Sequence, residues 1–218
     1  MKIKDFLAAF ATALVLLIAQ PSFAVETIGW EALVPPIDET LDPYPRLTED
    51  QQDSLYDLWM VRERRKLGSD SDDLDRLEKE ATDNLEADGL DAARIMQELD
   101  DFLALLEANK TRLVDSLDGK DVRIPGYVLP TEYAGDEVVE FLLVPYVGAC
   151  IHTPAPPLNQ LVQVRVEEGF TSEGMFAPVW VTGRMQTAMS TQSLYLVDGS
   201  MDIESGYKID ASEIAPYE

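Results

Sequence analysis

The sequence predicts an α+β protein, in which an acidic N-terminal helical hairpin is followed by a small antiparallel OB-like β-barrel. In residues 48–117, apolar side chains recur at spacings of three and four, which is typical of amphipathic helices. From Gly119 onward, apolar and polar residues alternate and turn residues recur at short intervals, which indicates short strands. We expect residues 118–218 to form the barrel domain.

The first 24 residues have the features of a secretory signal peptide. Lys2 and Lys4 precede an apolar core at residues 6–19, and Ser22 and Ala24 are small residues at the positions that a signal peptidase recognises. The core is shorter than the ~20 residues of a membrane-spanning helix, although an uncleaved anchor is the alternative. We expect cleavage after Ala24 and a periplasmic protein with no lipid anchor, no transmembrane segment and no disulfide, because the chain has one cysteine.

The charge of the chain argues against nucleic acid as a partner. It has 41 acidic and 17 basic residues, a net charge of −24. Proteins bind polyanions by neutralising phosphates with lysine and arginine, so the field of this chain would repel them. The acids are spread along helical faces, which is typical of a solvated surface.

Residues 25–47 are expected to form an extended arm, held by Trp30 and Leu33, because four prolines interrupt any regular helix. Three helices are expected next, with a capping box at the start of the first. Their narrow apolar stripes suit a hairpin that is either structural or a surface for a partner protein. The expected helices begin after the caps Thr48, Ser71 and Asp91 and end at Gly68, Gly89 and about Leu117.

The second half is expected to hold five or six short strands, too few for an immunoglobulin sandwich but suited to an OB-type barrel. One feature departs from that fold, because residues 167–178 are too short and too broken by glycine for the helix that often follows the third OB strand. The expected strands are Val122–Leu129, Val138–Val144, Leu161–Val166, Val179–Met185 and Leu194–Val197, with a last pairing segment near Tyr207–Ile209.

The single cysteine and the single histidine lie two residues apart, as Cys150 and His152. In an extended chain, the period of two places both side chains on one face. A thiolate and an imidazole suit zinc or copper. Two ligands are too few for a closed tetrahedral site, so an acid such as Glu132 or Glu140, a methionine or a second subunit must complete it.

Two other interpretations of this pair stay open. Cys150 is a buried apolar side chain and His152 a loop residue in one of them. In the other, His152 activates Cys150 as the nucleophile of an enzyme, although the chain has no second histidine and no protease or redox motif. The residues that follow are expected to support the loop through rigid backbone and side-chain hydrogen bonds. These are Pro156, Pro157, Asn159 and Gln160.

A series of motifs occurs in the second half: Asp118-Gly119-Lys120, VRIPGYVLP at 122–130, EFLLVPY at 140–146, GACIH at 148–152, PP at 156–157, NQ at 159–160 and PVWVTG at 178–183. Together with WEALVP at 30–35, this series resembles the DUF3299 family of bacterial envelope proteins of unknown function. The chain departs from the family pattern after His152, where TPAPP replaces an unbroken proline run.

The resemblance implies a class of function as well as a family. Relatives are often encoded beside exporter-type ABC transporters and periplasmic metal-handling proteins. The resemblance therefore implies an accessory or binding protein of an envelope transport system, with an envelope protein as its partner and zinc or copper as its metal. A thiol-dependent enzyme and a purely structural interaction barrel are the alternatives.

Overall fold

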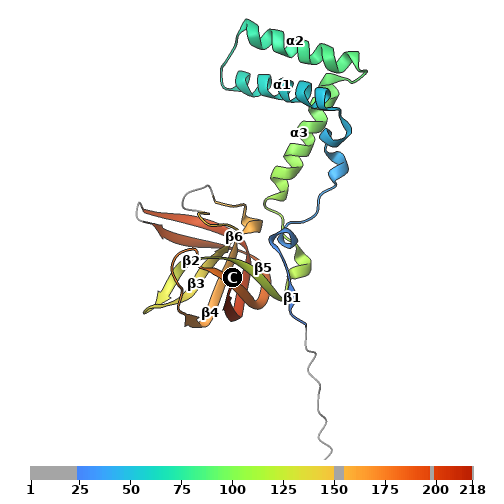
Figure 1. Ribbon diagram of the computed structural model, residues 1–218. Helices are drawn as coiled ribbons and strands as arrows, with labels where there is room; N and C mark the ends of the chain where they lie inside the picture. The colour runs from blue at the N-terminus through green and yellow to red at the C-terminus, as the bar shows by residue number, and fades with distance from the viewer. Residues whose placement is uncertain (1–23, 150–154, 197–198, 218) are drawn as a thin grey trace, which may run out of the picture.

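In the computed structural model, a region of three α-helices is followed by a mixed six-stranded sheet (Figure 1). The structure describes residues 24–149, 155–196 and 199–217. The chain is therefore α+β, as predicted. The proposed signal peptide lies almost wholly outside the described residues. The elements are β1 (Glu26–Thr27), η1 (Trp30–Leu33), η2 (Glu39–Leu41), η3 (Tyr44–Arg46), α1 (Glu49–Lys66), α2 (Asp72–Ala87), α3 (Ala92–Asn109), η4 (Asp115–Leu117), β2 (Asp121–Ala134), β3 (Glu137–Val144), η5 (Leu158–Gln160), β4 (Val162–Phe170), β5 (Pro178–Leu196) and β6 (Gly199–Pro216).

The strands pair in the order β1-β2-β3-β4-β6-β5, and β2 pairs a second time with β5. Each strand from β2 to β6 therefore has at least two strand neighbours, and β2 has three. The pairs β1–β2 and β4–β6 are parallel, and the others are antiparallel. The largest apolar cluster takes side chains from one face of all five of these strands, including Val122, Phe141, Val164, Met185 and Ile209.

A second apolar cluster covers the opposite face of β2 and β3. Leu129 and Leu142 pack there against Leu194 from β5 and Ile203 from β6. The β2–β3 pair is thus buried on both faces. This explains why residues 141–144 are apolar without alternation, since a strand covered on both sides has no face that meets water.

Two expected strands, Val179–Met185 and Leu194–Val197, are wrong as separate elements. Val179–Met185 and residues 194–196 both belong to the 19-residue β5, while Val197 lies outside the described residues. The last pairing segment near Tyr207–Ile209 belongs to the 18-residue β6. An irregularity in the β5–β6 register between Thr187 and Ser190 lets the pair bend. The intervening threonine, serine and glutamine residues tolerate strand geometry but supply no apolar alternation, so their pattern conceals the strand.

The predicted helix starts are confirmed by their caps. Thr48 and Gln51 form the reciprocal capping box of α1, while Ser71 and Asp91 accept backbone N–H groups at the starts of α2 and α3. Gly68 and Gly89 have φ of 84° and 78°, a left-handed conformation that suits glycine at a helix end. Among the described residues, no helix has both the length and the apolar character required to cross a bilayer.

Helices α1 and α2 form the hairpin, and α3 runs from it toward the sheet (Figure 1). Leu55 of α1 packs on Ile95 and Leu99 of α3, and a second cluster joins α1 to α2. The Arg62 guanidinium donates two hydrogen bonds to the Asp100 carboxylate, at 2.5 and 2.6 Å. This planar, two-point contact joins α1 to α3 in addition to their apolar packing.

The third helix is shorter than expected, because it ends at Asn109 and not near Leu117. The Asn109 amide donates to the Pro35 carbonyl oxygen at 2.9 Å, which ties the helix end to the N-terminal arm. Leu113 and Val114 then pack against the core of the sheet. Helical periodicity in these residues therefore reflected burial against a different element, not a continuing helix.

The Tyr207 hydroxyl joins three segments, which are β6, the N-terminal arm and the linker after α3. It accepts a hydrogen bond from the backbone N–H of Val114 (2.6 Å) and donates one to the carbonyl oxygen of Leu33 (2.7 Å). The Tyr207 side chain is fully buried. One phenol hydroxyl thus pairs with the Leu33 carbonyl oxygen in the N-terminal arm and with the Val114 N–H in the linker after α3. Neither backbone group has a backbone hydrogen-bond partner in a neighbouring strand that the structure describes.

We predict that Tyr207→Phe lowers the free energy of unfolding by about 2 kcal/mol, because a buried donor and a buried acceptor lose their partner. Tyr133→Phe, at a tyrosine that is 59% exposed, is the matched control and should have no effect. Urea denaturation followed by circular dichroism measures both. Equal stability of the two variants would contradict a structural role for this hydroxyl.

Burial raises the pKa of Tyr207 above its ordinary value of about 10, the hydrogen bond from Val114 opposes that rise, and the charge of Asp115 adds to it. The neutral phenol therefore favours the fold fully below about pH 10, and this contribution is lost as pH rises through the higher folded pKa. Tyr207→Phe should accordingly lose less stability than the parent protein as pH rises above about 10. The same denaturation at each pH measures this difference.

Candidate functional site

The predicted pair Cys150 and His152 lies outside the described residues, but the chain on both sides of it is placed. Ala149 is buried in the second apolar cluster, on the outer face of β2 and β3. Gly148 has φ of 88°, a left-handed turn that suits glycine. Pro156 is buried where the chain resumes. Buried residues are therefore found on both sides of the 150–154 segment.

Two of the expected loop supports, Asn159 and Gln160, make long-range hydrogen bonds. The buried Asn159 amide donates to the carbonyl oxygens of Asn109 (2.8 Å) and Arg112 (3.1 Å). The Gln160 amide donates to the carbonyl oxygen of Trp30 at 2.9 Å. These bonds connect the loop to the end of α3 and to the arm.

The other two loop residues act through the backbone. Pro157 precedes the short helix η5, and its carbonyl oxygen accepts the backbone N–H of Gln160 at 2.7 Å. Its φ of −56° is the value that the proline ring itself imposes. Trp30, whose carbonyl oxygen accepts the Gln160 amide, also joins the N-terminal arm to β2, because its indole donates to the Pro125 carbonyl oxygen at 2.8 Å. Loop, arm and β2 thus meet at one corner.

The two acids considered as additional metal ligands, Glu132 and Glu140, are opposite one another in the β2–β3 register. Both line a hollow that also contains Arg165, Glu167 and Asp210. Within the residues that the structure describes, no three histidine, cysteine, aspartate or glutamate side chains are placed to hold one metal ion. The acids alone therefore do not form a metal site.

Strand register brings charged residues together in a way that the sequence analysis did not predict. Glu140 is opposite Arg165, and Arg165 is opposite Asp210. Asp210 is in turn opposite Arg184, whose guanidinium contacts Asp121 at 3.3 Å. Alternating charges therefore follow one level around the strands. Alternation of polar residues indicated the outward face of each strand, but no local signal gives the register between strands.

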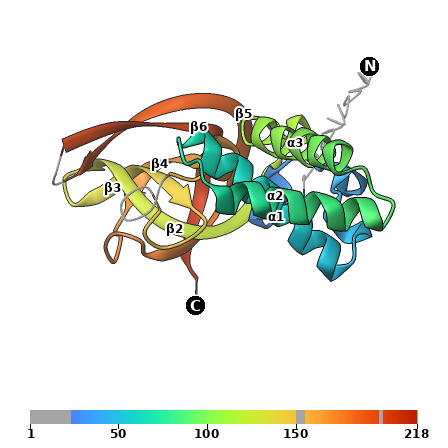
Figure 2. The same cartoon turned by 90° about the horizontal axis from the view of Figure 1, so that it is seen from above.

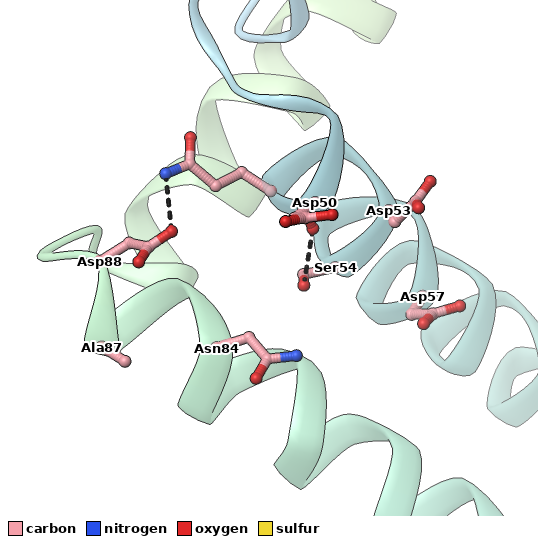
Figure 3. Close-up of a pocket in the computed structure, with 8 residues that line it drawn as sticks. Asp50, Asp53, Ser54, Asp57, Asn84, Ala87 and Asp88 are labelled. Carbon is pink, nitrogen blue, oxygen red and sulfur yellow. Dashed lines mark hydrogen bonds between the residues drawn. The ribbon is translucent and has the colours of Figure 1, made fainter.

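A polar groove between α1 and α2 is the other hollow of note (Figure 3). The Gln51 amide donates to Asp88 at 2.9 Å across it, and the Ser54 hydroxyl donates to the Asp50 carbonyl oxygen at 3.0 Å. Asp53 and Asp57 extend from α1, and Asn84 from α2 (Figure 3). These carboxylates are spread along the helix and not gathered on one point, which suits a solvated acidic surface.

We predict that Asn159→Ala lowers the free energy of unfolding by about 2 kcal/mol, because the two hydrogen bonds that the buried Asn159 amide donates to the carbonyl oxygens of Asn109 and Arg112 are lost. Asn84→Ala, at an exposed asparagine of α2, is the matched control and should leave stability unchanged or slightly raised, since alanine favours helix. Thermal denaturation compares them. A loss no larger than that of the control would show that the loop is held by other contacts.

Comparison with known proteins gives a family and no established activity. No curated protein matches the chain. A crystal structure of a DUF3299 family protein from Pseudomonas aeruginosa PAO1 is similar, with 25% sequence identity over 89% of this chain and 97% of that chain and a TM-score of 0.47. The model of DUF3299, a family described as proteins of unknown function, matches residues 30–216, which include the acidic helices. The chain therefore belongs to the DUF3299 family.

Proposed function

We propose that this protein is a non-enzymatic accessory or binding component of an ABC-type envelope transport system, and that Cys150 and His152 bind zinc or copper. The observation that carries this proposal is the anchoring of the loop at both ends. Ala149 is buried on one side and Asn159 on the other. A binding loop gains affinity when its supports are rigid, because less conformational freedom is lost on binding.

The form of the sheet supports the same class of function. We propose that β2 to β6 make an OB-like barrel, since each pairs with two others of this set and the parallel β4–β6 pair joins two antiparallel halves. In such a barrel, loops project from a rigid scaffold and supply the binding groups. The 145–161 connection, which leaves β3 and enters β4, is a loop of that kind.

The chemistry of the pair selects the metal class. A thiolate is a soft ligand and an imidazole a borderline one, so together they favour zinc or copper over calcium and magnesium, which prefer oxygen. Residues other than Cys150 and His152 must supply the ligands that complete the coordination of the metal. Glu132 and Glu140 are the acids that we propose for this role, because the β2–β3 register already places them opposite one another.

We predict that the parent protein binds one equivalent of zinc and that Cys150→Ser and His152→Ala each weaken binding at least tenfold, since each removes one of few ligands. Isothermal titration calorimetry measures the affinity, and circular dichroism checks the fold. Tyr146→Phe, beside the loop, is the control and should bind like the parent. Unchanged binding in both ligand variants would remove the metal proposal. Rapid alkylation of Cys150 at neutral pH would instead favour a thiol enzyme.

We also propose that residues 1–24 direct the chain to the periplasm and are then removed. The basic start, the short apolar core and the small residues Ser22 and Ala24 support this. Protein recovered from the periplasmic fraction is expected to begin at Val25 by intact-mass spectrometry. Substituting Ala24 by the bulky Leu should block cleavage and leave the longer mass with the membrane fraction. Full-length protein in the cytoplasm would contradict the proposal.

A further inference from the structure

The strands β4 and β6 separate at one end of the sheet. Their parallel pairing ends where Val166 is opposite Ala211. Both strands continue, β4 to Phe170 and β6 to Pro216. The β5–β6 register skips Ser212 at this point, and an irregularity of this kind bends a strand. Beyond it, the C-terminal end of β6 leaves the sheet on a side that the helices do not cover (Figures 1 and 2).

A pocket with a volume of about 430 Å³ lies where the two strands have separated. Its lining comes from the end of β4, the β4–β5 connection and the adjoining ends of β5 and β6. Most of the lining side chains are apolar, among them Phe170, Val179, Ile214 and Tyr217. Apolar pockets of roughly 300–1,000 Å³ are typical of sites for small organic molecules. The size and the lining therefore suit a small molecule with an apolar group.

Two aromatic side chains of the lining are held by contacts outside the pocket. Phe170 packs edge-on against the buried Phe141, with the ring centroids 5.5 Å apart. Tyr217 packs edge-on against Trp180 at 5.2 Å. The Tyr217 backbone N–H also donates to the Pro178 carbonyl oxygen at 3.2 Å. The rings are thus in place before a ligand arrives, so less conformational freedom is lost on binding.

The β4–β5 connection is fixed in an unusual backbone conformation beside the pocket. Phe176 has φ of 62°, a left-handed conformation that is unfavourable for a bulky side chain. Its backbone N–H donates to the Val128 carbonyl oxygen at 2.7 Å, and its side chain packs on the second apolar cluster. Ala177, the next residue, lines the pocket. Strain of this kind persists where the surrounding structure imposes it, and it is frequent beside ligand sites.

The charge around the pocket selects the class of ligand. Residues 167–179 and 211–217 include four acids and no lysine or arginine. Glu173 lines the pocket, and no lysine or arginine of the described residues forms an ion pair with it. Arg123 lies over Trp180, 4.7 Å from the ring centroid, and is outside the lining. An anion is therefore repelled here and an ammonium group is attracted. The four acids, all exposed, are Glu167, Glu168, Glu173 and Glu213.

We propose that this pocket binds a small amphiphilic amine, which is a free molecule with an apolar chain or ring and an ammonium group. The apolar part packs against Phe170, Val179 and Ile214, and the ammonium group pairs with the Glu173 carboxylate. An ion pair that is exposed to water contributes little, so burial of the apolar part supplies most of the affinity and Glu173 supplies the preference for a cation. The inference goes beyond the proposed function and does not depend on metal binding.

Isothermal titration calorimetry at neutral pH tests the site with octylamine, octanol and octanoate, which share one apolar chain and differ in charge. We expect octylamine to bind about threefold more tightly than octanol, and octanoate to bind more weakly than either. Glu173→Gln should remove the advantage of the amine and leave octanol binding unchanged. Glu168→Gln, at an exposed acid of β4 outside the lining, removes the same charge and should keep that advantage.

Nuclear magnetic resonance of the parent protein titrated with octylamine locates the site without a variant. The changes in backbone amide shifts should be largest in residues 170–179 and 213–217. The proposal is overturned if octylamine does not bind, if the three probes bind equally, or if Glu173→Gln keeps the advantage of the amine. Shift changes that map instead to the acidic groove between α1 and α2, around Asp53 and Asp57, also overturn it.

Discussion

The buried hydrogen bonds at the joint between arm, helices and sheet are the constraint on which this structure depends. Tyr207 and Asn159, both on the sheet side, satisfy backbone groups of Leu33, Val114, Asn109 and Arg112. Leu33 ends the short helix η1 and Asn109 ends α3, and Val114 and Arg112 lie in the linker that follows α3. A buried backbone group without a partner costs more than a hydrogen bond contributes, so the joint holds one geometry.

The same joint places the loop that carries Cys150 and His152. Asn159 and Gln160 follow that loop directly, and their amides reach the end of α3 and the arm at Trp30. Ala149 precedes the loop and is buried in the same apolar cluster as Leu194 of β5 and Ile203 of β6. The loop therefore contacts the end of α3, the N-terminal arm and the β5–β6 pair. A substitution that moves any of these elements is expected to change the position of the loop.

Charge is distributed to match this architecture. Acids concentrate on the helices, where ion pairs between neighbouring turns such as Lys79–Asp83 offset part of the repulsion. Around the sheet, opposite charges alternate from strand to strand at the level of Arg165. Residues 185–196 of β5 carry no charge.

The sequence by itself determined the features that depend on neighbours in the chain. Helix starts at Thr48, Ser71 and Asp91 followed from caps a few residues from the backbone groups they bind, and the apolar run of β3 from its own burial. Only the tertiary structure decided that α3 ends at Asn109, that β5 continues through its polar stretch, and that Asn159 contacts residues about 50 positions away. Strand register and buried amide partners join distant segments, and local patterns carry no information about which distant groups will meet.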